Sequence, residues 1–148
     1  MLKTRVITSL AAIVIVGVVL FALPASYAEV IIGLLIVGGA WEWSGFLGAE
    51  RQGVRLAYTG LITAVLIALF PLLATQGFLV LQVACAWWFI AFLWNLRFPT
   101  PSPTAARWVS GFLVLVPLFV ALVTLFRLGV EYLLFTLLIV WLADGGAY

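Results

Sequence analysis

Long apolar runs, separated by short polar connections, make up almost the whole chain. The runs show no alternation of apolar and polar positions, which favours helices over strands. A membrane-spanning helix needs ~20 apolar residues, and only helices and closed barrels pair all their backbone groups inside lipid. We therefore predict an all-α polytopic bundle of about six transmembrane helices. The predicted segments cover residues 6–23, 28–47, 56–74, 78–96, 108–126 and 130–143.

Polar residues, glycines and prolines mark the predicted connections between these segments. Residues 50–55 form a polar loop, and residues 75–77 (Thr-Gln-Gly) are predicted to form a tight turn. Three prolines between residues 97 and 107 exclude a continuous helix there. Pro71 and Pro117 fall inside predicted helices, and we expect each to kink its helix.

The composition places these helices in lipid. Hydrophobic residues make up 67% of the 148 residues and charged residues 8%, and there is no histidine. Soluble domains are nearer half apolar and a quarter charged, so the outer surface of this chain must meet lipid. We treat residues 1–148 as a single transmembrane domain. The scattered basic residues give no support to nucleic-acid binding, and the lone Cys85 cannot form an internal disulfide.

The basic residues indicate how the chain is oriented in the membrane. With the N-terminus in the cytoplasm, six of the seven basic residues lie on the cytoplasmic side, and Arg127 lies outside. Five tryptophans also fall near the predicted cytoplasmic ends, where indole rings anchor at lipid headgroups. We therefore predict a cytoplasmic N-terminus. The five tryptophans are Trp41, Trp43, Trp94, Trp108 and Trp141.

Small residues recur every four positions in two of the segments. Such stripes let helix backbones approach one another closely in lipid, so they are candidate packing faces. The stripes are Ala40, Ser44 and Gly48 in one segment and Gly60, Ala64 and Ala68 in the other.

Acidic side chains are costly inside a bilayer, by roughly 2.5–3.5 kcal/mol at its centre. Glu29 and Glu131 begin predicted helices, where the helix dipole favours them, and Glu50 lies in a polar loop. Glu42 lies inside the predicted end of its helix and so needs either an ion-pair partner or a water-filled pocket. Both interpretations stay open. The candidate partners on the same side are Arg51, Arg55, Arg97 and Arg107.

Asp144 directly follows the sixth predicted segment, at a helix C-terminus where the helix dipole disfavours a carboxylate. Gly145 and Gly146 follow it and allow close approach of a backbone or a ligand. A carboxylate there could bind Mg²⁺ together with phosphate oxygens. The pattern alone, however, indicates only a polytopic membrane protein.

Three stretches resemble the bacterial phosphatidate cytidylyltransferases, the CDP-diacylglycerol synthases. Residues 1–8 resemble the opening of that family, and residues 39–43 (Gly-Ala-Trp-Glu-Trp) are similar to its second-helix segment. Residues 143–148 (Ala-Asp-Gly-Gly-Ala-Tyr) are similar to its Ala-Asp-x-Gly-Ala-Tyr segment. The three matches follow the order of the family and cover its N-terminal part.

The resemblance implies transfer of a cytidylyl group from CTP to phosphatidic acid, with Mg²⁺, at the cytoplasmic face of the bacterial inner membrane. By the same resemblance, residues at the end of the chain line the nucleotide and metal pocket, with Asp144 as a metal ligand. Trp41, Glu42 and Trp43 are expected to be pocket or helix-packing residues. The catalytic residues themselves are not identified. The expected pocket residues are Asp144, Gly145, Gly146 and Tyr148.

The family continues past the counterpart of Tyr148 into segments that carry its main metal-binding aspartates. This chain holds none of them, so we expect an N-terminal fragment that is inactive alone. Alternatives are a small transporter or channel subunit, suggested by Glu42, and a non-catalytic scaffold. The oligomeric state is open, with a homodimer as one option, and membrane lipids are expected partners.

Lys3 and Arg5, the apolar run after them and the sequence Ser-Tyr-Ala at residues 26–28 imitate a secretory signal. The run spans residues 6–23, longer than a typical signal core of ~7–15 residues, so we expect no cleavage. N-terminal sequencing of the mature protein should therefore start near Met1. A sequence that began at Glu29 would show that a signal peptide is removed.

Overall fold

The computed structural model describes residues 14–47, 52–97, 99 and 103–146, and within them the ordered elements are all helices. The prediction of an all-α chain is confirmed for this part. A helix spans residues 14–21. The elements that follow are α2 (Ala25–Ser44), the 3-10 turn η1 (Gly45–Leu47), α3 (Gln52–Leu69), the 3-10 turn η2 (Phe70–Leu72), α4 (Leu73–Asn95), α5 (Thr104–Leu128) and α6 (Val130–Gly146).

Three stretches of the described residues are long and apolar enough to cross a membrane. They are Ala25–Leu47, Gln52–Asn95 and Thr104–Leu128. Their composition indicates an integral membrane protein. Six crossings and a cytoplasmic N-terminus stay predictions, and Lys3 and Arg5 lie outside the described residues.

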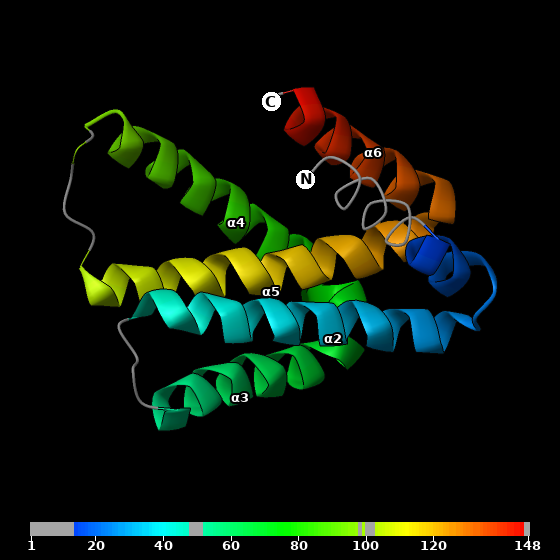
Figure 1. The fold of residues 1–148 in the computed structure, drawn as a ribbon, viewed down its shortest axis with the longest axis horizontal. Coiled ribbons are helices and arrows are strands. Elements are labelled where there is room, and N and C mark those ends of the chain that lie inside the picture. Colours follow the sequence, from blue (N-terminus) through cyan, green and yellow to red (C-terminus); the bar gives the residue numbers. More distant parts are fainter. Residues whose placement is uncertain (1–13, 48–51, 98, 100–102, 147–148) are drawn as a thin grey trace, which may run out of the picture.

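Helices α2 and α5 run antiparallel, side by side, through the middle of the molecule (Figure 1). The buried face of α2 repeats every four residues, so it forms one continuous ridge along the helix. Two of its residues, Ala28 and Ala40, are fully buried. Methyl groups added at Gly33 and Gly39 of α2 would touch Phe119 and Leu115 of α5, so small residues let these two helices approach closely. The ridge is Ala28, Ile32, Ile36, Ala40 and Ser44.

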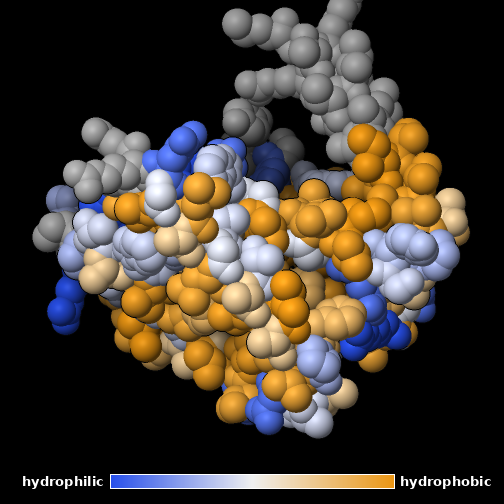
Figure 2. Space-filling model, turned by 90° about the horizontal axis from the view of Figure 1, so that it is seen from below, coloured by the Kyte–Doolittle hydropathy of each residue, from blue (hydrophilic) through white to orange (hydrophobic). Residues whose placement is uncertain are grey.

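The other helices pack on this pair over part of their length. Helix α3 buries Tyr58, Ile62 and Leu66 against it. Helix α6 lies against α5 and buries Leu133, whereas its last turns are exposed. The face seen in Figure 2 is mostly hydrophobic, with few hydrophilic residues, as expected of a surface that meets lipid.

The tight turn predicted at residues 75–77 is wrong, because these residues are helical and lie inside α4. The chain bends earlier, at η2, where Pro71 interrupts the hydrogen bonding between α3 and α4. Gly77 is buried instead of turning the chain, and an added methyl group there would touch Val120 of α5. Its small size serves helix packing.

The two prolines inside predicted helices have different outcomes. Pro71 ends its helix in a 3-10 turn, whereas α5 continues through Pro117. In the first small-residue stripe, Ala40 and Ser44 are buried as predicted, and Gly48 lies outside the described residues. The stripe that starts at Gly60 is exposed, because α3 packs through its larger residues instead.

An ion pair joins the start of α2 to the end of α5. The Nε of Arg127 donates to Oε1 of Glu29 at 2.6 Å, and its second nitrogen donates to Oε2 at 3.2 Å. The Glu29 side chain is 11% exposed and that of Arg127 42%. The guanidinium also lies 5.2 Å from the ring of Phe70. The sequence pattern did not predict this ion pair. The pair accounts for the carboxylate at this position more fully than the favourable helix dipole does by itself.

Replacement of Glu29 by Gln should lower the free energy of unfolding by about 1–3 kcal/mol. A fully buried pair would cost ~3–5 kcal/mol, but Arg127 is partly exposed and retains some hydration. Chemical unfolding in detergent measures the effect, with Glu131→Gln as an exposed control that should change stability by less than ~0.5 kcal/mol. A double-mutant cycle with Arg127→Gln that gave no coupling energy would contradict the pair.

Candidate functional site

The predicted pocket residues Trp41 and Trp43 lie where α2 ends, and Arg55 of α3 holds this end. The Nε of Arg55 donates to Oγ of Ser44 at 3.0 Å, and another guanidinium nitrogen donates to the carbonyl of Trp41 at 3.0 Å. The guanidinium stacks on the Trp41 ring, 4.3 Å from its centroid. A cation therefore binds a carbonyl in the last turn of α2, the end of the helix at which the dipole favours positive charge.

A second set of contacts joins the same end of α2 to the start of α5. The indole nitrogen of Trp43 donates to the carbonyl of Arg107 at 3.0 Å, and the Arg107 guanidinium donates to the carbonyl of Phe46 at 2.9 Å. The Tyr58 hydroxyl donates to the carbonyl of Trp108 at 3.4 Å. The Tyr58 and Trp108 rings meet edge to face at 5.1 Å, so α2, α3 and α5 are fixed together here.

Gly111 of α5 makes this junction sterically feasible. A methyl group added at Gly111 would overlap the indole of Trp43 and the hydroxyl of Tyr58. The glycine therefore leaves the space in which both side chains reach α5. We call these residues, with Trp41, Ser44, Arg55, Arg107 and Trp108, the aromatic junction.

Glu42 lies beside the aromatic junction but is not part of it. Its side chain is exposed, and among the described residues it forms no ion pair. Arg55 and Arg107 bind backbone carbonyls near it instead. Arg51, another predicted partner, lies outside the described residues. The choice between a structural pair and a pocket role for Glu42 stays a prediction.

Asp144 lies in the last turn of α6, where it is exposed, and Gly145 and Gly146 complete the helix. Tyr148 lies outside the described residues. Figure 1 shows this end of α6 well away from the end of α2 that carries Glu42. The two predicted acidic site residues are therefore not brought together.

Within the part of the chain that the structure describes, no three His, Cys, Asp or Glu side chains gather into a metal centre. Mg²⁺ is usually held by one or two carboxylates together with substrate phosphates. Asp144 can supply one such carboxylate, but the described residues do not by themselves form a magnesium site.

The sequence pattern did not predict the contacts of Arg55, Tyr58 and Gly111. Each depends on which helices meet, and nothing local to these residues reveals it. The clustering of tryptophans at one side was the available signal, because indole nitrogens at a helix end need acceptors.

Known proteins are similar to the chain over its whole length. A model of the cytidylyltransferase family matches residues 3–148. The phosphatidate cytidylyltransferase of Pseudomonas aeruginosa is 34% identical over 154 aligned residues, which cover 100% of this chain and 56% of that protein. The enzyme of the same name from Haemophilus influenzae is 29% identical over 175 residues, with 100% and 59% covered. No solved structure matches the chain. The chain thus spans a little more than half the length of these relatives.

Gly111→Ala should destabilise the protein by about 1–3 kcal/mol, the usual cost of overpacking, despite the better helix propensity of alanine. Gly38→Ala is the matched control, because an added methyl group meets nothing within 4 Å there. Thermal unfolding in detergent should separate the two variants. Equal stability of both would show that the aromatic junction relaxes freely around residue 111.

Proposed function

Because the chain belongs to the cytidylyltransferase family, we propose that the protein takes part in the transfer of a cytidylyl group from CTP to phosphatidic acid. In this reaction a phosphate oxygen of phosphatidic acid attacks the α-phosphorus of CTP, and pyrophosphate leaves. CDP-diacylglycerol, a phospholipid precursor, is the product. The observation that carries the proposal is the family match over residues 3–148, together with the names of both relatives.

The membrane architecture suits a lipid substrate and a water-soluble nucleotide. Phosphatidic acid would arrive within the bilayer and CTP from the cytoplasm. Three arginines, Arg55, Arg97 and Arg107, lie on helix ends that the fold gathers at one end of the molecule, and Arg127 lies at the other (Figure 1). This asymmetry supports an orientation with the first end in the cytoplasm. We also place the protein in a bacterial inner membrane, because three stretches are long and apolar enough to cross a bilayer and both relatives are bacterial enzymes.

In this proposal the aromatic junction is a scaffold. Most of its hydrogen bonds end on backbone carbonyls, and one ends on the Ser44 hydroxyl. In the proposed orientation these bonds would hold α2, α3 and α5 together at the cytoplasmic side. Trp41 and Trp43 are packing residues of this scaffold. Exposed Glu42 lies at its edge, where it could still face a ligand.

We further propose that Asp144, with Gly145, Gly146 and Tyr148, borders the nucleotide pocket. An exposed carboxylate at the end of α6 can coordinate a divalent cation such as Mg²⁺ that also binds phosphates. A bound divalent cation would neutralise phosphate charge during transfer. The relatives are much longer than this chain, so we expect the remaining ligands and the catalytic groups in a segment beyond the matched part.

Asp144→Asn should reduce CTP-dependent formation of CDP-diacylglycerol at least about tenfold, or ~1.4 kcal/mol in the activation barrier. The protein is assayed at its native length, purified from its source membranes, and released pyrophosphate is measured. Glu131→Gln, at the opposite end of α6, is the matched control and should retain activity. Full activity of Asp144→Asn would remove Asp144 from the pocket. Absence of CTP turnover in the unmutated protein would overturn the proposed function itself.

A further inference from the structure

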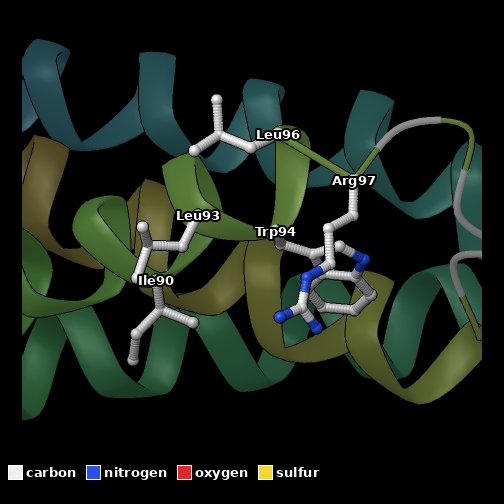
Figure 3. Close-up of a pocket in the computed structure, with 5 residues that line it drawn as sticks. All are labelled: Ile90, Leu93, Trp94, Leu96 and Arg97. Atoms are coloured by element: carbon white, nitrogen blue, oxygen red, sulfur yellow. The ribbon is translucent and has the colours of Figure 1, made fainter.

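The last turns of α4 carry a groove on the surface of the molecule (Figure 3). Its volume is about 590 Å³. Ile90, Leu93 and Trp94 lie at the i, i+3, i+4 spacing of one face of α4, and Arg97 follows in the turn after the helix, so the groove runs along the end of α4. The lining residues are Ile90, Leu93, Trp94, Leu96 and Arg97.

The end of α4 is mostly exposed, and among the described residues only Trp87 and Ala91 in this part are partly buried. The buried residues of α4 are Leu73, Gly77 and Ala84, all in its first half. Beyond them, large apolar side chains such as Phe89 and Phe92 are more than half exposed. Figure 1 shows the end of α4 leading away from α5. The groove is therefore open to whatever surrounds the protein.

Arg97 gives the groove a charge that nothing in the described structure neutralises. Its side chain is exposed, and it forms no ion pair or side-chain hydrogen bond with the described residues. Arg127, by contrast, is paired with Glu29, and Arg55 is held by Ser44 and Trp41. Arg97 is thus a cation at the end of an apolar groove with its donors available.

The groove has an apolar part and a charged part, as an amphiphilic lipid does. Ile90 and Leu93 form the apolar part, and Figure 3 shows them on the opposite side from Arg97 and the indole of Trp94. Tryptophan prefers the boundary between hydrocarbon and headgroups. Arginine binds phosphate oxygens bidentately. A free nucleotide fits less well, because the described lining offers polar donors only at Arg97 and Trp94.

We propose that the end of α4 is a binding site for an anionic glycerophospholipid of the cytoplasmic leaflet. The lipid phosphate pairs with Arg97 beside Trp94, and one acyl chain lies along Leu93 and Ile90. The site rests on the membrane orientation proposed above and is independent of cytidylyl transfer. With this site the protein would bind anionic lipids more strongly than neutral lipids at the end of α4.

The test measures retained lipid by native mass spectrometry, without CTP. Purified protein is mixed with phosphatidylglycerol or phosphatidylcholine of equal chain length. Phosphatidylglycerol is used because it is anionic and is not the proposed substrate. We expect the protein to retain phosphatidylglycerol about fivefold better, the factor that corresponds to ~1 kcal/mol for one basic residue at an anionic surface. Arg97→Gln should abolish the preference, and Arg97→Lys should keep most of it.

Two controls make the result specific to the groove. Lys3→Gln removes the same charge elsewhere in the chain and should leave the preference intact. Leu93→Asn should lower retention of both lipids, because it places a polar group where the acyl chain lies. The proposal fails if Arg97→Gln retains phosphatidylglycerol like the unmutated protein, or if Lys3→Gln loses as much. It also fails if millimolar inorganic phosphate displaces the lipid, since the site would then bind a free anion.

Discussion

The antiparallel contact between α2 and α5 is the feature on which the rest of the structure depends. Helices in lipid gain little from apolar burial, so their relative position must come from close packing and from polar groups that need partners. Here small residues give the packing, and polar contacts fix both ends of the pair. Glu29 pairs with Arg127 at one end, and Trp43 binds the carbonyl of Arg107 at the other. The two arginines are separated by about 30 Å of helix, close to the thickness of a hydrocarbon core.

Sequence patterns predicted the helices well, because continuous apolar runs leave few other ways to satisfy a backbone in lipid. The sequence patterns predicted the positions of the helix ends less accurately. Residues 75–77 look like a turn, yet Gly77 serves close packing against Val120, and the chain bends at Pro71. A missing backbone donor is a local constraint that a proline imposes anywhere. A glycine imposes no such constraint on the backbone. Whether it allows a turn or close helix packing depends on the helix that packs against it.

The candidate site was predictable only in part. Trp41 and Trp43 stood out as residues with polar atoms near a helix end, and the structure gives both a contact in the aromatic junction. Their partners could not be inferred, because Tyr58 and Gly111 come from other helices and look ordinary in sequence. The arginines proposed for Glu42 were reasonable by charge, but carbonyls at the end of α2 compete for the same donors.

The separation of Glu29 and Arg127 along the chain has a consequence for biogenesis. The two residues are 98 positions apart. A ribosome adds about 5–20 residues per second, so roughly 5–20 s pass between the synthesis of the carboxylate and that of its partner. During that interval Glu29 lacks Arg127, and an unpaired carboxylate is costly in hydrocarbon, so the start of α2 must stay near the interface or bind a temporary partner. The ion pair can therefore form only after the end of α5 has been synthesised.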